Sequence, residues 1–448
     1  MDSGDALRRD AERSGDAGVA PTAGPQPALL ETIDDPGSAA RGARVMARCD
    51  ALAAFTEEPG RITRPYGTSA LTGARNLLAE WMREAGMDVQ IDAVGDLRGR
   101  FAGGSAGAPI LLLGSHFDSV RDAGRYDGPL GILIAIEAVD HLRHTKWPKP
   151  FPIEIVAFAD EEGLRFQTTY LGSSALAGTF DLAFLDLVDG AGVTLREAMA
   201  GFGGDPDGLA GAALQPGEVF AYVEVHIEQG PQLEAVDAAV GVVTAISGQT
   251  RILTTLTGAA GHAGTVAMHL RRDPLPAAAE CVLAVETMAR ETSGLLATVG
   301  MIEARPGASN VIAGEVHFTL DVRHPEDGAR VEAVQALERQ VRSVAARRDL
   351  EIAWRIARDH PAVPCDAALV ARLAAAVAAT GQRVERLPSG AGHDAVVMAA
   401  VVPVAMLFVR CAGGISHHPA ESVAVADLAV VLEVIDRFLD SYGNDKRP

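Results

Sequence analysis

Short apolar runs bounded by polar turns recur along the chain, and they predict its buried strands. Four such runs are expected to be strands: residues 110–113, which should be buried, and residues 153–158, 220–225 and 404–409. Apolar residues at helical spacing predict helices over residues 70–85, 131–142 and 423–442. Strand, helix and strand follow one another in this order, so the pattern predicts an α/β fold with a mostly parallel sheet.

The pattern changes near residue 244. Three strands are expected within residues 251–321, together with a helix over residues 274–290, and a second helix and a fourth strand follow. The α/β pattern then resumes, which predicts an inserted α+β domain. The expected division is a disordered tail over residues 1–27, a first catalytic part over 28–243, the insert over 244–357, and a second catalytic part over 358–448.

Residues of the types that commonly bind metal ions follow three successive predicted strands. His116 follows the first strand, Glu161 and Glu162 follow the second, and His226 follows the third. The last apolar run leads to a further histidine pair, His417 and His418. Because sites in open α/β sheets form at the carboxyl ends of strands, these residues predict one shared site.

The segment after the first strand contains two aspartates besides His116. His116 and Asp118 are two residues apart, so on an extended backbone both side chains point to the same side. This arrangement suits a histidine ligand that is oriented by a carboxylate. Asp127 lies in a loop with glycines at positions 124 and 128, where the backbone turns freely and can return the carboxylate to His116.

A site for two metal ions accounts for the whole set. Histidine with carboxylate suits Zn, Mn, Co or Ni better than Ca or Mg. Asp127 can bridge two such ions, and the terminal ligands are then His116, Glu162, His226 and one of His417 and His418. Glu161 and Glu162 are neighbours at a strand end, so their side chains are expected to diverge. One can then bind metal while the other acts as general base toward a bridging water.

Composition and charge exclude several classes of partner. The chain has 39 basic and 59 acidic residues, a formal net charge of −20, so nucleic acid and anionic membranes are not expected partners. No apolar segment follows the N-terminal arginines, so a secretion signal is not expected. The longest apolar run, residues 395–409, is short and interrupted by Pro403, so it is not expected to span a membrane. Four widely spaced cysteines (Cys49, Cys281, Cys365, Cys411) predict reduced thiols and a cytoplasmic protein.

Seven segments in this order give a specific resemblance: GSHFDSVRDAGRYDG, FADEEGLRF, VHIEQGPQLE, GHAGTVAM, SNVIAGEVHFTLDVR, SGAGHD and GISHHPAE. The chain resembles the dinuclear-metal amidohydrolase family, which contains allantoate amidohydrolase, N-carbamoyl-L-amino-acid hydrolase and β-ureidopropionase. The resemblance covers about residues 39–441. It implies a mostly parallel-sheet metallohydrolase catalytic domain with an inserted α+β domain that serves as lid and dimerisation domain, and hence a homodimer.

The resemblance also implies roles for individual residues. It implies two divalent metal ions per chain (Mn, Zn, Co or Ni) held by His116, Asp127, Glu162, His226 and His417. Asp118 would stand behind these ligands, and Glu161 would be the general base. The insert would bring His262, Asn310 and Arg323 to the substrate, and Gln229 would lie near the ureido group. In physical terms, His262 can stabilise a developing oxyanion, and Arg323 can clamp the carboxylate of a small anionic ureido substrate.

In sequence, the first and last of these segments resemble allantoate amidohydrolase most closely. The expected reaction is hydrolysis of one ureido group of allantoate to ureidoglycine or ureidoglycolate, ammonia and carbon dioxide. A first alternative is an N-carbamoyl-L-amino-acid hydrolase, or a β-ureidopropionase-like enzyme, with the same machinery. A second, from another class, is a non-catalytic binding protein on a hydrolase fold. The complete ligand set with Glu161 argues against it, because a scaffold has no need of a reactive water.

Overall fold

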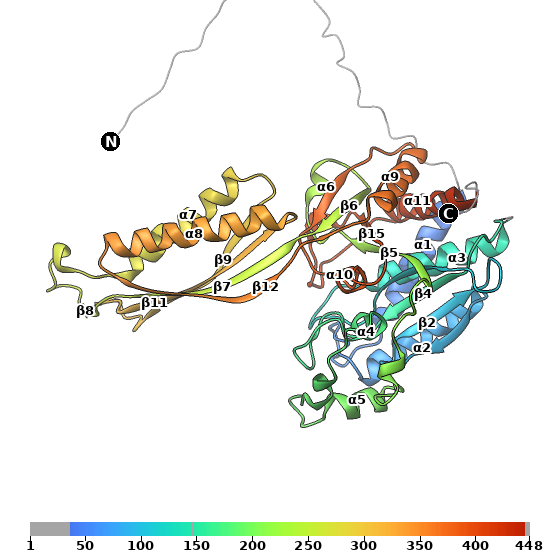
Figure 1. Ribbon diagram of the computed structural model, residues 1–448, viewed down its shortest axis with the longest axis horizontal. Coiled ribbons are helices and arrows are strands. Elements are labelled where there is room, and N and C mark those ends of the chain that lie inside the picture. Colours follow the sequence, from blue (N-terminus) through green and yellow to red (C-terminus); the bar gives the residue numbers. More distant parts are fainter. Residues whose placement is uncertain (1–35, 146, 444–448) are drawn as a thin grey trace, which may run out of the picture. The chain divides into compact units, whose positions relative to one another are not determined.

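The computed structural model describes residues 36–145 and 147–443. The predicted disordered tail, residues 1–27, lies outside the described residues. Within the described ranges, the strands form a nine-stranded sheet, a four-stranded sheet and a separate two-stranded pair. Figure 1 shows these sheets with their helices.

The nine-stranded sheet is parallel at its centre and antiparallel at its edges. Its strands run in the order β1-β2-β4-β3-β5-β15-β6-β13, and β14 pairs with β6. The pairs β4–β3, β3–β5, β5–β15 and β14–β6 are parallel. The bounds are β1 (Asp88–Ile91), β2 (Leu97–Phe101), β3 (Ile110–His116), β4 (Ile153–Phe158), β5 (Val219–Ile227), β6 (Val240–Ile246), β13 (Val363–Pro364), β14 (Arg386–Ser389) and β15 (Val404–Val409).

The helices of this part cover the sheet and one another. α3 packs against β3 and β5, α11 packs against α3 and α9, and α2 packs against β1 and β2. The long helices are α1 (Pro36–Ala53), α2 (Ser69–Glu84), α3 (Pro129–His144), α9 (Ala367–Ala379) and α11 (Val425–Gly443). The short ones are α4 (Leu171–Leu176), α5 (Leu195–Gly201), α6 (Gln232–Ala235) and α10 (Ala395–Met398).

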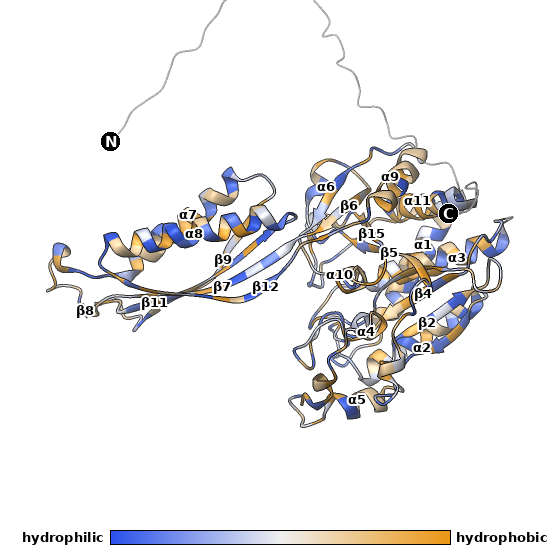
Figure 2. Cartoon of the chain, in the orientation of Figure 1, coloured by the Kyte–Doolittle hydropathy of each residue, from blue (hydrophilic) through white to orange (hydrophobic). Residues whose placement is uncertain are grey.

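The four apolar runs predicted as strands correspond to β3, β4, β5 and β15, so this prediction is confirmed. Every residue of β3, β4 and β15 is buried, as expected for strands covered on both faces. Figure 2 shows the hydrophobic residues along these strands and along α3. The predicted α/β class with a largely parallel central sheet is confirmed. No described helix is long and apolar enough to cross a membrane.

Residues 248–360 contain the antiparallel four-stranded sheet, in the order β12-β7-β11-β9. Its elements are β7 (Gly248–Thr257), α7 (Pro274–Glu291), β9 (Leu296–Arg305), β11 (Glu315–His324), α8 (Asp327–Arg347) and β12 (Glu351–His360). β11 alternates buried and partly exposed residues, which gives the sheet one face against α7 and α8 and one exposed face. The two-stranded pair is β8 (Gly261–His262) with β10 (Val311–Ile312).

The sheets bear on the predicted domain boundaries. The predicted start of the insert, residue 244, falls inside β6, and β6 belongs to the nine-stranded sheet. β7 begins two residues after β6 ends, so the chain passes from the nine-stranded sheet to the four-stranded sheet with almost no loop between the two strands. The division into domains therefore stays a prediction, although the two helices and four long strands expected of the insert are present.

Candidate metal centre

Three adjacent strands of the nine-stranded sheet end at the same place. β3 ends at His116, and β5 carries His226 one residue before its end. Gly114 pairs with Glu224 in parallel register, so His116 and His226 are neighbours two residues further along. β4 ends at Phe158, opposite His116, and the loop with the two glutamates follows directly. The topology therefore gathers residues that are far apart in the sequence.

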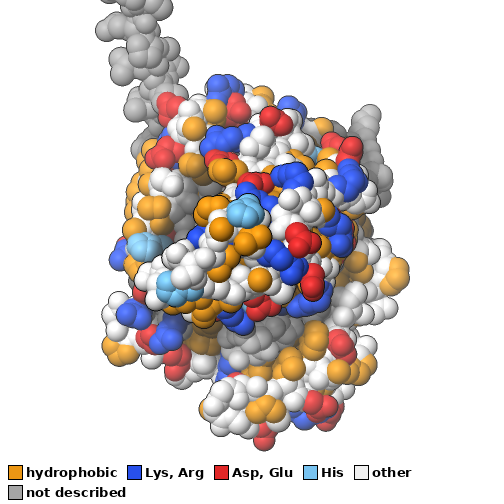
Figure 3. All heavy atoms as spheres, turned by 90° about the vertical axis from the view of Figure 1, so that its left-hand side faces the viewer, with side chains coloured by type: hydrophobic (Ala, Val, Ile, Leu, Met, Phe, Trp, Pro, Cys, Tyr) orange, Lys and Arg blue, Asp and Glu red, His pale blue; other side chains and the backbone are white. Residues whose placement is uncertain are grey.

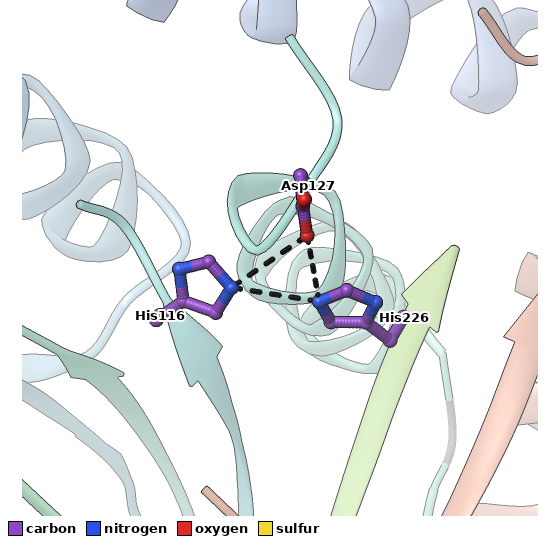
Figure 4. A group of neighbouring side chains, drawn as sticks. All are labelled: His116, Asp127 and His226. Atoms are coloured by element: carbon purple, nitrogen blue, oxygen red, sulfur yellow. Dashed lines mark hydrogen bonds and ion pairs between the residues drawn. The ribbon is translucent and has the colours of Figure 1, made fainter. Parts of the chain in front are cut away.

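His116, Asp127 and His226 form the buried part of the cluster (Figure 4). The Nε2 atom of His226 lies 3.2 Å from Oδ1 of Asp127, and Nε2 of His116 lies 3.8 Å from the same oxygen. The two Nε2 atoms are 3.5 Å apart. Gly128 follows Asp127 with φ 83°, and a Cβ at Gly128 would lie 2.4 Å from Cε1 of His116. Only glycine allows the loop to pass this close to the ring.

Asp127 also belongs to a second, more exposed group with Glu162 and His417. Nε2 of His417 lies 3.1 Å from Oδ2 of Asp127 and 3.4 Å from Oε1 of Glu162. Each of the three residues offers one ligand atom, and these atoms lie within 4.8 Å of one another. His418 has a different contact, because its Nδ1 accepts the backbone N–H of Ala420. Asp127 thus faces one group of ligand atoms with each of its two oxygens.

Asp118 connects His116 to the glutamate loop. Its Oδ1 lies 3.4 Å from Nδ1 of His116, and its carboxylate accepts the backbone N–H groups of Glu161 (3.1 Å) and Glu162 (3.2 Å). The expectation that Glu161 and Glu162 diverge is wrong, because one oxygen of each lies within 4.8 Å of a ring nitrogen of His116. Strand alternation no longer applies there, since β4 ends at Phe158 and Asp160 has φ 66°.

Burial and mutual charge shift the protonation equilibria of the cluster. Burial opposes ionisation of Asp127, but hydrogen bonds from three histidines outweigh it and hold the pKa of Asp127 well below its usual range. Burial raises the pKa of Glu161 well above its ordinary value. Burial, helped by the charge of Asp127, raises the pKa of Glu162 to about 7. The bond to Asp127 raises the pKa of His417 to about 9. The carboxylates are thus crowded with too few cations to compensate them.

The donor atoms fit a metal ion. Nδ1 of His226 lies 2.9 Å from the carbonyl oxygen of Ile227, which can only accept, so in the neutral ring Nδ1 carries the proton. Nδ1 of His116 faces the carboxylate of Asp118 in the same way. Both Nε2 lone pairs then point at each other and at Asp127, an arrangement that a cation between them would stabilise. Imidazole with carboxylate suits Zn, Mn, Co or Ni.

The cluster opens into a cavity of about 230 Å³. Gln229 lines it, and its Nε2 donates hydrogen bonds to Oδ1 (3.2 Å) and Oδ2 (3.1 Å) of Asp127. Gln229, Tyr170 and His417 all line the cavity with positive φ, although none is glycine. Such strained backbone is concentrated at functional sites. The lining residues are His116, Asp127, Glu161, Glu162, Thr169, Tyr170, His226, Gln229, Arg323, Ala391, Gly392 and His417.

Arg323 lines the same cavity from β11, so the four-stranded sheet contributes a cation to it. Its Nε and Nη2 donate to the two oxygens of Asp321 at 2.7 and 3.0 Å, and its Nη1 donates to the carbonyl of Gly390 at 2.6 Å. These bonds use three of the five N–H groups of a guanidinium. One N–H on each terminal nitrogen is left, so the guanidinium can still donate hydrogen bonds to a carboxylate.

His262 and Asn310 are placed differently. Neither belongs to the described lining of the cavity. His262 lies in β8, opposite Val311 of β10, and its exposed ring accepts the N–H of Gly264 at Nδ1. Asn310 is exposed, and its carbonyl accepts the N–H of Ala263. The structure therefore brings these two predicted substrate residues close to one another, His262 in β8 and Asn310 directly before β10, and neither belongs to the described cavity lining.

Sequence reasoning missed several residues of the site. Ser416 donates to Oδ2 of Asp127 at 2.8 Å, and Glu421 accepts the backbone N–H of Asp127. Both lie in the segment GISHHPAE, so proximity to His417 was an available signal. His393, in SGAGHD, packs its ring 4.6 Å from that of His226, and burial lowers its pKa well below the ordinary value. Tyr170 has no local signal in the sequence.

Comparison with known proteins agrees with this geometry. Residues 112–441 match the family model described as peptidase family M20/M25/M40. An N-carbamoyl-L-amino acid amidohydrolase of Geobacillus stearothermophilus is 40% identical over 396 residues, which cover 88% of this chain and 97% of the relative. An allantoate deiminase of Arabidopsis thaliana is 38% identical over 427 residues, covering 88% and 81%.

The fold has solved counterparts as well. The crystal structure of an amidase of the hydantoinase/carbamoylase family from Burkholderia multivorans superposes with a TM-score of 0.86 at 34% identity, covering 90% of this chain and 98% of that one. The matched residues include every member of the His116–Asp127–His226 cluster and of the Asp127–Glu162–His417 group. With sequence match and fold in agreement, the chain belongs to the peptidase family M20/M25/M40.

Proposed function

We propose that this protein hydrolyses a C–N bond of a linear ureido group in a small anionic substrate, most directly allantoate. The observation that supports this best is the shared cavity, in which a cluster of histidines and carboxylates lies with the guanidinium of Arg323. The cluster suits metal-assisted hydrolysis, and the guanidinium suits a carboxylate on the substrate. A chain with a formal charge of −20 needs such a local cation to bind an anion.

The proposed ligands of two divalent ions, Mn, Zn, Co or Ni, are His116, Asp127, Glu162, His226 and His417. Asp127 would be shared, because each of its oxygens faces a different group of ligand atoms. Asp118 would orient His116 through Nδ1. When bound, such ions lower the pKa of a coordinated water and polarise a carbonyl oxygen.

Glu161 is the proposed general base. Its carboxylate is buried beside His116 and lines the cavity, and burial raises its pKa, which makes it a better proton acceptor. It would take a proton from the water that attacks the ureido carbon and return it to the leaving nitrogen as the C–N bond breaks. Gln229, at the wall of the cavity, would contact the ureido group, and Arg323 would bind the substrate carboxylate.

The leading alternative is an N-carbamoyl-L-amino acid as substrate. It carries the same ureido group and a carboxylate, so the roles of Glu161 and Arg323 would be unchanged. The relatives that bear the two names are similarly distant from this chain, at 40% and 38% identity. Overall identity therefore does not separate the two substrates, and a direct measurement must.

We further propose a homodimer that forms through residues 244–357. This segment exposes large apolar side chains on α7 and β9, among them Leu283 (62% exposed) and Leu296 (58% exposed). Figure 3, viewed from the side where β8 lies in Figure 1, shows hydrophobic and histidine side chains among charged ones. A second copy would also account for His262 and Asn310, which line no described part of the cavity in their own chain. Sedimentation of Leu283→Arg tests this, since a persistent dimer would place the interface elsewhere.

A cytoplasmic location is proposed on the basis of the cysteines. All four are buried and unpaired, so the fold uses no disulfide that an oxidising compartment would supply.

The decisive experiment measures turnover of allantoate and of a panel of N-carbamoyl-L-amino acids. Metal-depleted protein is supplied separately with Mn, Co, Ni or Zn. A higher kcat/KM for allantoate supports the first proposal, and a higher value for one carbamoyl amino acid supports the alternative. Binding of either substrate without turnover under every metal would instead identify a non-catalytic binding protein.

A further inference from the structure

Glu421 is a buried carboxylate close to the metal centre that has no place among its ligands. It follows His417 by four residues and is 4% exposed. Its Oε1 accepts the backbone N–H groups of Tyr126 (2.7 Å) and Asp127 (3.1 Å). Among the described residues, it belongs to none of the groups whose ligand atoms converge. Its contacts are therefore with the backbone that carries Asp127, and not with the ligand atoms themselves.

Ser416 extends this contact to the Asp127 side chain. Its Oγ donates to Oδ2 of Asp127 at 2.8 Å and lies 3.4 Å from Oε2 of Glu421. The same Oγ accepts a hydrogen bond from Nε2 of Gln229 at 3.2 Å. Residues 416–421 therefore hold Asp127 at its backbone through Glu421 and at its carboxylate through Ser416.

The carboxylate of Glu421 also packs closely against the backbone of the loop that carries Asp127. Gly124 lies in the loop that carries Asp127, and a Cβ at Gly124 would lie 2.3 Å from Oε1 of Glu421. The carboxylate thus lies directly against the backbone of residues 124–127. Asp127 in turn needs a defined orientation, because its two oxygens face two different groups of ligand atoms. A small rotation of the loop would remove one oxygen from one of these groups.

We propose that Glu421 is a positioning residue for the metal centre, which fixes the loop of Asp127 against the loop of His417. The inference rests on the proposed function only in taking Asp127 and His417 as metal ligands. Residues that orient metal ligands contribute about 10–100-fold to metal affinity. Glu421 does this through hydrogen bonds to the backbone, which an isosteric amide oxygen can also accept.

The test compares Glu421→Ala, Glu421→Gln and Ser416→Ala in the full chain. Metal-depleted protein is titrated with Mn²⁺ by calorimetry, and the visible spectrum of the Co²⁺-loaded protein reports the ligand geometry. Glu421→Ala should weaken the affinity about 10–100-fold and change the Co²⁺ spectrum. Glu421→Gln should stay within a few-fold of wild type, because its oxygen can still accept both N–H bonds. Ser416→Ala, which loses only the side-chain bond, should lie between them.

Glu137→Gln is the matched control for loss of stability. Glu137 is fully buried and paired with Arg44, but it lies on α3 and lines no described part of the cavity. Its substitution should lower the Tm without changing metal affinity. The inference is overturned if Glu421→Ala binds Mn²⁺ like wild type, or if Glu137→Gln weakens binding as much. Should Glu421→Ala fail to fold, Ser416→Ala decides, and wild-type affinity in that variant overturns the inference.

These measurements need no substrate, so the inference and the proposed function fail separately. If Glu421→Ala weakens Mn²⁺ affinity as expected, but the wild-type protein hydrolyses neither class of substrate, the proposed function alone is overturned. Full hydrolysis by wild type with unchanged metal affinity in Glu421→Ala would overturn the positioning role alone. Absence of metal binding by the wild-type protein would overturn both.

Discussion

Glu161 and Glu162 are neighbours in the sequence but have different surroundings. Glu162 lies 3.4 Å from the ring of His417, whereas Glu161 is 8% exposed and no histidine contacts it at ion-pair distance among the described residues. The carboxylate of Asp118 accepts the backbone N–H groups of both glutamates, so the same contact fixes the backbone from which both side chains extend. This difference at the scale of single residues supports different roles for the two carboxylates.

Glu161→Gln should keep the fold and the bound metal but lose nearly all turnover. The amide has the same shape, yet it cannot accept the proton from the attacking water. Loss of a general base costs about 10²–10⁴ in rate. Metal analysis and kcat are measured on the same preparation. A metal-free variant would identify Glu161 as a ligand, and the assigned roles of Glu161 and Glu162 would then be exchanged.

Arg323→Ala should raise KM for anionic ureido substrates, with a loss of about 2–5 kcal/mol of binding if the ion pair is desolvated. Arg323→Lys should also raise KM, because an ammonium offers no planar pair of donors. Arg251→Ala is the matched control, since Arg251 also pairs with Asp321 but does not line the cavity. An uncharged substrate amide separates the roles: if Arg323→Ala slows its hydrolysis equally, the residue supports structure and does not bind the carboxylate.

At the scale of elements, the site depends on how closely α3 approaches the sheet. Gly131, in the first turn of α3, faces β5, and a Cβ there would lie 2.0 Å from the carbonyl oxygen of Val225. Val225 immediately precedes His226. The absence of a side chain therefore lets the helix after Asp127 lie against the strand that carries His226.

Gly131→Ala should destabilise the protein by about 1–3 kcal/mol, because the added methyl group must displace backbone. Since the displaced strand carries His226, metal affinity should fall as well. Gly190→Ala serves as the control, because a Cβ there would meet nothing within 4 Å and the φ of Gly190 is not positive. Chemical denaturation measures both variants. Equal stability of the two proteins would contradict the close packing of α3 on β5.

At the scale of the whole molecule, the ionisable cluster couples stability to pH and metal. In the metal-free protein the pKa of Glu162 rises from 4.5 to about 7 and that of His417 from 6.5 to about 9. The folded state therefore binds protons more tightly than the unfolded state at both residues. Their stabilising effect is complete below the unfolded pKa and is lost as pH rises through the folded pKa.

The unfolding free energy of the metal-free protein should accordingly fall between about pH 5 and about pH 9. Metal binding needs the deprotonated ligands, so metal should stabilise the protein more as pH rises. Thermal unfolding with and without Mn²⁺ at about pH 5.5 and about pH 8.5 measures this. The gain in Tm from metal should be larger at the higher pH. A gain that is constant or smaller there would contradict the assigned ligands.

The sequence by itself determined the class of fold, and it predicted the histidines and carboxylates that the structure brings together. Long apolar runs need burial on both faces, so β3, β4, β5 and β15 were predictable from local composition. The polar residues that come after those runs could be predicted to lie together, because the carboxyl ends of parallel strands meet at one edge of the sheet. Short elements such as β13 and α6 were missed, since two to four residues carry no periodic signal.

Only the tertiary structure decided how the residues meet. It turned Glu161 and Glu162 toward the same histidine, because Asp160 leaves the extended conformation that the alternation rule assumes. It paired Arg323 with Asp321, placed His262 in β8 with Asn310 directly before β10, and set Glu421 against the backbone of Asp127. These contacts join residues distant in the sequence, and local patterns specify which face a side chain takes but not which distant side chain it meets.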